Sequence, residues 1–435
     1  MSFARQRCTW TPQHIPGEKL KAWEQLGDAA DKHMCPVPPR QTGLPSLDLF
    51  IERMVADSSL HVGTLPKWVD RQLLDDGMRF FVETWPLVFV SFGWAVVGGF
   101  GCESASAVLL ESRYWASDGE SGRRDTWKRL RETACWLYDI CAPGAQAFEP
   151  GGAAWTAALH VRYLHSRTRA ELAAKHPGGV GSFAAEFGAP INQLQLVGTL
   201  LGSSALLLEG IERAMGLPLR ARDKDGFLHL WRLVGHLFGI DDEKNPNVTC
   251  AHARTVMESV FLYAIPAAPR AHLTHALSSH IYKAVCQGTK EDYGVPVSEA
   301  VLAAQARLYL GTSYSDAIGL PSVTWLQTLI AITRLAFFRV LFAPYFLLGA
   351  DAAADASGAA AAAASGKAAA STAASSRIAR AAAVMGAVLH ARVIRLIYHF
   401  LMRRSFASLV HRVRVSQPAC RFGKSLDATQ VTKAE

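Results

Sequence analysis

Hydrophobic residues recur at intervals of three and four positions along most of this chain, which is the period of an amphipathic helix. The periodic segments are separated by turn-forming stretches such as SDGESG, HPGGVGSF and DDEKNPN. Strand-like alternation between these turns is scarce. The pattern predicts a large all-α domain that starts near residue 66. Helices are expected over residues 103–114, 123–140, 153–174, 192–215, 223–238, 250–263, 268–284 and 297–309.

Two segments are apolar enough to raise the question of a membrane. The segment from Trp85 to Gly101 has no charged residue and ends in a glycine cluster. Since it is shorter than the ~20 residues that span a bilayer, we favour a buried core helix. The segment from Trp325 to Ala350 carries Arg334 and Arg339, and charges inside a membrane span are costly. A membrane-lying anchor and a buried helix both remain open for it.

The two ends of the chain differ from its centre. The first 60 residues are rich in proline and show little periodicity, apart from a short helix expected near residues 47–55. Near the other end, an Ala/Ser/Gly tract precedes a basic amphipathic helix of the type that lies on anionic membranes. We therefore expect an extended arm (1–60), a large helical domain (61–312), an apolar helical segment (313–350), a linker (351–376) and a basic amphipathic helix with its tail (377–435).

Composition narrows the classes of partner and compartment. Of the 435 residues, 50% are hydrophobic and 19% charged, which excludes wholesale disorder. The net charge of +8 suits an anionic membrane surface, whereas the aromatic–basic alternation that stacks nucleic-acid bases is not evident, so no nucleic acid is expected. The eight cysteines form no Cys-x-x-Cys pair, which favours reduced thiols in a cytosol-facing protein. The first residues contain no apolar run, so a secretory signal peptide is not expected.

Several common catalytic motifs are absent from the sequence. There is no Gly-x-Ser-x-Gly, Walker A, His-Glu-x-x-His or Gly-x-Gly-x-x-Gly motif, and no Glu-x-x-His pair of the kind found in di-iron bundles. What remains are histidines on helices.

One of these histidines is expected to face inward. His165 shares a helical face with Val161 and Leu172. A neutral imidazole there can be a packed core side chain, a ligand of a metal or haem iron, or a catalytic base. Arg162 and Arg169 lie three positions before it and four after it, so they neighbour it on the helix. They suit pairing with a carboxylate, a haem propionate or a substrate anion, or a solvated helix edge.

The order of several motifs resembles one known family over roughly residues 66–285. RLRETACWLYDICAPGAQAFEPGG is followed by ALHVRYLHSRTRAEL, by PINQLQLVGTLLGSSALLLEGIERAMGLPL and by WRLVGHLFGI. This series is similar to that of the ER-bound oxygenase MpaB and of rubber oxygenase (latex-clearing protein). The resemblance implies a globin-like helical catalytic domain. It also implies oxidative chemistry on apolar chains, such as cleavage of isoprenoid double bonds by dioxygen at a b-type haem.

The resemblance also implies roles for particular residues. His165 matches the histidine of the family's Arg-x-x-His helix, which is the proximal haem ligand in rubber oxygenases. Arg162 and Arg169 match the arginines around it, which implies contact with the haem propionates. Arg129 and Thr133 of RLRET match an arginine and a threonine of the distal pocket. Their alternative interpretation is ordinary helix-surface polarity.

Four further residues complete the expected site. Thr199 matches a second pocket threonine, with packing as the alternative. Glu111 is the nearest candidate for a catalytic acid upstream of RLRET. The position before the pocket threonine is basic in rubber oxygenases but is Glu132 here, so Glu132 is a rival acid and rubber itself is in doubt as substrate. His236 is the alternative iron ligand.

The expected function is that of a haem-dependent oxygenase acting on a long apolar isoprenoid or lipid substrate, with dioxygen as co-substrate. Its expected location is a membrane such as that of the endoplasmic reticulum, facing the cytosol. Two alternatives use the same scaffold: a non-catalytic membrane-associated lipid-binding protein, and a membrane-anchored interaction protein with a vestigial pocket.

Overall fold

The computed structural model describes most of the chain up to residue 347. The described residues are 2–3, 6–7, 9–34, 44–99, 101–112, 119–141, 144–175, 180–263, 271–294 and 296–347. Their regular elements are helices, apart from one antiparallel pair of two-residue strands, β1 (Ser2–Phe3) and β2 (Gln6–Arg7). The prediction of an all-α fold is confirmed.

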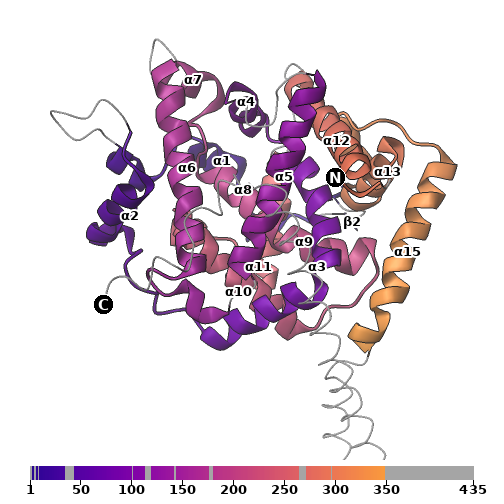
Figure 1. Cartoon of the computed structure of the whole chain (residues 1–435), viewed down its shortest axis with the longest axis horizontal. Helices are drawn as coiled ribbons and strands as arrows, with labels where there is room; N and C mark the ends of the chain where they lie inside the picture. Colours follow the sequence, from indigo (N-terminus) through magenta and orange to yellow (C-terminus); the bar gives the residue numbers. More distant parts are fainter. Residues whose placement is uncertain are drawn as a thin grey trace, which may run out of the picture.

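The helices follow one another through short connections and pack around a shared core (Figure 1). In chain order they are α1 (Gly17–Trp23), η1 (Ala29–Met34), α2 (Leu47–Ala56), η2 (Ser58–Leu60), α3 (Arg71–Gly99), α4 (Glu103–Glu111), α5 (Gly119–Cys141), η3 (Ala145–Phe148), α6 (Ala153–Lys175), α7 (Val180–Phe187), α8 (Gln193–Ser203), α9 (Ala205–Glu209), η4 (Gly210–Ala214), α10 (Ala221–Leu237), η5 (Asp242–Lys244), α11 (Cys250–Tyr263), α12 (Ala271–Tyr293), α13 (Glu299–Leu310), α14 (Thr312–Ala317) and α15 (Trp325–Leu347).

Most of these ranges agree with the sequence prediction, but the helix expected over 192–215 is divided in three. Ser204 separates α8 from α9 because its backbone leaves the helical region (φ −129°, ψ −91°). Its hydroxyl lies 2.7 Å from the carbonyl oxygen of Leu200 and 3.1 Å from Oδ1 of Asn247. The stretch then ends in the π-helical turn η4.

The long helix α3 lies in the core and bends once. Thr84 has non-helical angles (φ −119°, ψ 15°), and its hydroxyl donates to the carbonyl of Phe80 at 2.6 Å. Pro86 follows two positions later, and a proline cannot donate a backbone hydrogen bond. In the described part of the segment expected to be a core helix (85–101), one side of α3 is buried in the core, namely Leu87, Val88, Ser91, Trp94, Ala95, Val97 and Gly98.

By length and composition alone, two helical stretches of the described chain could cross a membrane. They are Arg71–Gly99 and Gln193–Ala214, and 61% and 78% of their most apolar windows are buried in the protein. Helices in the core of a soluble protein pass the same test.

Helices α3 and α10 cross with their backbones almost in contact. A Cβ atom at Gly77 would lie 2.2 Å from the carbonyl oxygen of Gly226, and one at Gly226 would lie 2.7 Å from the amide nitrogen of Gly77. These distances leave no room for a methyl group on either helix. The glycine pair therefore fixes how closely the two central helices approach.

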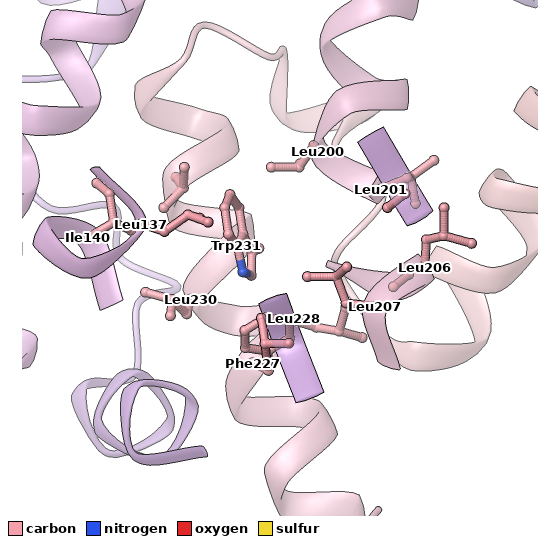
Figure 2. Close-up of a cluster of buried hydrophobic side chains, with 14 of the residues drawn as sticks. Leu137, Ile140, Leu200, Leu201, Leu206, Leu207, Phe227, Leu228, Leu230 and Trp231 are labelled. Carbon is pink, nitrogen blue, oxygen red and sulfur yellow. The ribbon is translucent and has the colours of Figure 1, made fainter. Parts of the chain in front are cut away.

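Beside this crossing, Trp231 of α10 is surrounded by aliphatic side chains from several helices. Figure 2 shows the indole between residues of α5 on one side and leucines of α8 and α9 on the other. Trp231 also makes ring contacts with Phe227 and Trp136, both with centroids 6.2 Å apart. This cluster joins four helices into one core.

The N-terminal region differs from the predicted extended arm. The short helix expected near residues 47–55 is present as α2, and Figure 1 shows it at the edge of the molecule beside α6. However, residues 17–34 also form helices, and Leu20, Trp23, Phe50 and Met54 are buried in the main core. The predicted arm therefore folds as a set of short helices, residues 17–34 and 47–56, whose apolar side chains pack on the main domain. We call these residues the N-terminal cap. The predicted linker (351–376) and basic helix (377–435) lie outside the described residues.

Candidate functional site

Helix α6 carries two buried arginines that form ion pairs with the N-terminal cap. Arg162 donates from Nε and Nη2 to the two carboxylate oxygens of Asp28, at 2.8 and 2.6 Å. Arg169 binds Asp31 in the same two-point manner, with both distances 2.7 Å. Its Nη2 also lies 3.5 Å from Asp28. The side chains of Arg162 and Asp28 are only 3% and 1% exposed.

This network corrects one expectation from the sequence. Arg162 and Arg169 were expected to face haem propionates, yet Nε and Nη2 of Arg162 bind Asp28, and Nε, Nη1 and Nη2 of Arg169 bind Asp31 and the Ile191 carbonyl. Burial alone would raise the pKa of Asp28, but the charges of Arg162 and Arg169 outweigh it and hold that pKa below its usual value. The two arginines therefore attach the cap to α6.

His165 lies between these two arginines along α6. Burial, together with the charge of Arg169, lowers the pKa of His165 to about 3, although Asp28 opposes the shift. The ring is therefore neutral at physiological pH. Its Nδ1 atom is buried and has no hydrogen-bond partner, and the ring packs edge-on against Phe238 at a centroid distance of 5.9 Å. The residue as a whole is only partly buried. A buried polar atom without a partner is uncommon and requires an explanation.

Helix α5 runs beside α6 and brings the RLRET segment to the level of His165. The indole of Trp136 donates to the carbonyl of Ala157 at 3.1 Å, and its ring contacts Phe238 at 5.7 Å. Arg129 lies two turns from Trp136 along α5, and His165 lies about two turns from Ala157 along α6, so both are the same distance from the Trp136–Ala157 contact when the two helices run antiparallel. This places Arg129 about level with His165.

The side chains of the RLRET segment differ in burial. Arg129 and Thr133 are partly buried, and the Thr133 hydroxyl donates to the Arg129 carbonyl at 3.0 Å. Glu132 is only 3% exposed. A carboxyl group so enclosed is unusual unless it is paired or has a functional role.

Two other predicted site residues, Glu111 and Thr199, are exposed to solvent. Glu111 is exposed and is the last residue of α4, a helix that contacts α7 and α12. Thr199 is exposed on α8, and its carbonyl accepts a hydrogen bond from the Ser203 hydroxyl at 3.0 Å. Of the two rival acids, Glu132 is therefore the one inside the protein, on the helix that packs against α6.

The alternative ligand His236 already has partners for both ring nitrogens. Its Nδ1 lies 3.0 Å from a carboxylate oxygen of Asp242, and its Nε2 lies 3.2 Å from the carbonyl oxygen of His61. His229, two turns away, accepts a hydrogen bond from the backbone amide of Asp70 at 2.8 Å. Both histidines serve the packing of loops against α10. In the described part of the chain, no group of three or more His, Cys, Asp or Glu residues is arranged to hold a metal ion.

Sequence reasoning missed Asp28, Asp31 and Phe238. The two aspartates lie in the region expected to be an extended arm, about 130 positions from the arginines that they bind. The available signal was the pair of arginines itself, because an arginine beside a buried site needs an anionic partner. Nothing in the local pattern indicates which carboxylate provides it.

Comparison with known proteins shows which family this sequence matches. A family model described as "ER-bound oxygenase mpaB/B'/Rubber oxygenase, catalytic domain" matches residues 80–343. A rubber oxygenase from Streptomyces sp. (strain K30) is 24% identical over 275 residues, which is 62% of this chain. The match spans about three fifths (61%) of the length of that relative.

A solved structure shares the same arrangement of helices. It is described as latex clearing protein LCP in the closed state, with a TM-score of 0.50 and 23% sequence identity. The match covers 74% of this chain and 78% of the other. At this identity the likeness shows the fold. Because the family model matches more than half of the sequence and includes α5, α6 and α8, this chain belongs to the family of ER-bound oxygenase MpaB and rubber oxygenase catalytic domains.

Proposed function

We propose that this protein is a haem-dependent oxygenase that acts on a long apolar isoprenoid or lipid chain, with cleavage of a carbon–carbon double bond as its reaction. The observation that carries the proposal is His165. It is a neutral imidazole with a buried, unpartnered nitrogen, on the helix that faces RLRET, within the matched catalytic domain. A b-type haem, when bound, supplies the iron at which dioxygen is activated.

His165 fits the proposed haem, whereas Arg162 and Arg169 do not take the role expected for them. His165 fits an axial ligand because iron binds the neutral form of imidazole, and a pKa of about 3 ensures that form. Arg162 and Arg169 differ from expectation because their charges are paired with Asp28 and Asp31. We assign them the role of holding α6, and hence His165, against the N-terminal cap.

Helix α5 provides the polar groups on the other side of the proposed site. Arg129 is a cation at the level of His165, and Thr133 is one turn further along the same helix. We propose that they orient the oxidant and the substrate. Glu132 is the proposed proton-transfer group because it is buried on the helix that packs against α6, whereas Glu111 is exposed. Thr199 stays a predicted pocket residue.

The substrate is proposed by class only. The curated relative is named for rubber, a polyisoprenoid. The acidic Glu132 at a position expected to be basic favours a different apolar chain in this protein. Membrane association also stays a prediction, since the basic C-terminal helix lies outside the described residues.

The test is an absorption spectrum of the purified full chain, produced with haem available. We expect a Soret band in the wild type and its loss in His165→Ala. His160→Ala is the matched control, because His160 is a partly buried histidine on the same helix, and it should keep the band. A wild type without Soret band or iron would refute the haem proposal and favour the lipid-binding alternative. A band that survives in His165→Ala would refute the ligand assignment alone.

A further inference from the structure

Helix α15 presents an apolar face that nothing in the described chain covers. In Figure 1 it is the orange helix at the edge of the molecule. The side chains of Ala331, Leu335 and Phe342 are buried, and α13 is its main contact. On the other side, Trp325, Phe337 and Val340 are 78%, 64% and 74% exposed. Seven of the twelve exposed large hydrophobic residues of the described chain lie on this one helix.

The exposed residues of α15 form one continuous stripe. At 3.6 residues per turn, the helical positions of Trp325, Leu326, Leu329, Ile330, Ile332, Phe337 and Val340 fall within about half of the helix circumference. The two margins of that half are occupied by Arg339 and Arg334. We call this surface the α15 face.

The charges on α15 are of one sign. Between Trp325 and Leu347 there is no aspartate, glutamate or lysine, and the two arginines have no ion-pair partner among the described residues. Arginines at the margins of an apolar stripe can lay their aliphatic stems along the apolar surface and place the guanidinium groups in a polar layer. An exposed apolar stripe bordered by cations suits the boundary between the apolar and the anionic layers of a lipid surface.

A hollow beside α15 continues the α15 face toward the body of the protein. This cavity of about 580 Å³ lies between η4, α13 and α15, and its lining includes Met215, Leu308 and Leu335 with the cationic Arg213 and Arg339. Arg213 is paired with Glu209. Arg339 is thus the exposed cation at the meeting point of the cavity and the α15 face.

Charge decides which partner suits this face. The segment that follows in the sequence, residues 377–415, contains eight arginines and no acidic residue, so it would bring like charge to α15. A second copy docked about a two-fold axis would bring the same arginines together. An anionic lipid surface complements the arginines and accepts the apolar stripe. We infer that the α15 face docks on the surface of an anionic lipid bilayer.

The experiment measures binding of the full chain to vesicles by flotation. The vesicles are phosphatidylcholine alone or phosphatidylcholine with phosphatidylglycerol. The double variant Phe337→Gln/Val340→Gln should lower partitioning at least about tenfold, because two exposed apolar side chains no longer enter the interface. Arg339→Glu should lower partitioning to the anionic vesicles and leave the weaker binding to neutral ones little changed.

The matched control is Val55→Gln/Val248→Gln, which removes two exposed hydrophobic residues from other surfaces and should bind as the wild type does. Undiminished binding of the α15 variants, or no binding of the wild type to anionic vesicles, would overturn the proposal. So would a wild-type dimer in solution that the Phe337→Gln/Val340→Gln change converts to monomers, since the face would then be a protein interface. Because the assay needs no haem, its result is independent of the proposed reaction.

Discussion

The substitution Asp28→Asn removes one negative charge from the ion pairs that hold the N-terminal cap on α6. Asp28 accepts two hydrogen bonds from Arg162 and one from the amide of Ala30, at 2.9 Å, and it also lies near Arg169. Asparagine has nearly the same shape. The change therefore tests the charge rather than the packing.

The expected cost follows from burial. Arg169 keeps Asp31 as its partner, whereas Arg162 loses its only recorded ion pair while 3% exposed. Removing one partner of a buried pair leaves an uncompensated charge, which destabilises a protein by about 3–5 kcal/mol. Because the side-chain oxygen of asparagine still accepts one hydrogen bond, we expect a loss of about 3 kcal/mol in the free energy of unfolding. Asp31→Asn should cost about 1 kcal/mol or less, since Asp31 is 34% exposed.

The measurement is urea-induced unfolding followed by circular dichroism at neutral pH. A double-mutant cycle with Arg162→Met measures the interaction energy between Asp28 and Arg162. The double variant should lose less stability than the sum of the losses in the two single variants. A loss below about 1 kcal/mol for Asp28→Asn, or a larger loss for Asp31→Asn, would show that burial does not set the strength of these pairs.

Acid adds a second readout for the same residue. The folded-state pKa of Asp28 lies below its unfolded value because Arg162 and Arg169 outweigh the effect of burial. Its contribution is therefore fully present above the unfolded pKa of about 3.9 and is lost as the pH falls from there through the folded pKa. The stability difference between wild type and Asp28→Asn should be constant from pH 5 to 7 and should shrink below about pH 4. A difference that persists unchanged into that acid range would contradict the assignment.

Two further predictions concern the helix crossing and the site. Gly77→Ala should destabilise the fold by several kcal/mol, because its methyl group would overlap the α10 backbone. Gly93→Ala is the control, because a Cβ there meets nothing within 4 Å, and it should be neutral or stabilising by about 0.5–1 kcal/mol. Equal melting temperatures for the two variants would contradict this reasoning. Glu132→Gln should lower turnover of an isoprenoid substrate, measured by oxygen uptake, at least about tenfold, and Glu111→Gln should leave it unchanged. A larger loss of turnover in Glu111→Gln than in Glu132→Gln would assign the proton-transfer role to Glu111.

The helical architecture was predictable because it depends on local information. Hydrophobic period and turn residues placed α10 and α11 almost to the residue. The division of the 192–215 stretch at Ser204 was not predictable, because its side chain bonds to Asn247 of a distant loop. The cap was missed for a different reason, because the hydrophobic residues around Trp23 are too few to show a helical period.

The candidate site was predictable in part. The inward position of His165 followed from the helical pattern, and its neighbours on α5 came from the family resemblance. The partners of its flanking arginines could not be read from the sequence, because a long-range ion pair leaves no periodic signal. The difference between Glu132 and Glu111 likewise required the structure, which shows one enclosed and the other exposed.

The docked N-terminal cap has a practical consequence for anyone who trims this protein. The family match starts at residue 80, which makes that position an inviting place to begin a shortened chain. Such a chain would lack the cap with Asp28 and Asp31, so Arg162 and Arg169 would lose the carboxylates that they bind. The boundary suggested by sequence similarity is therefore not the boundary of the folding unit. A shortened version should begin ahead of α1.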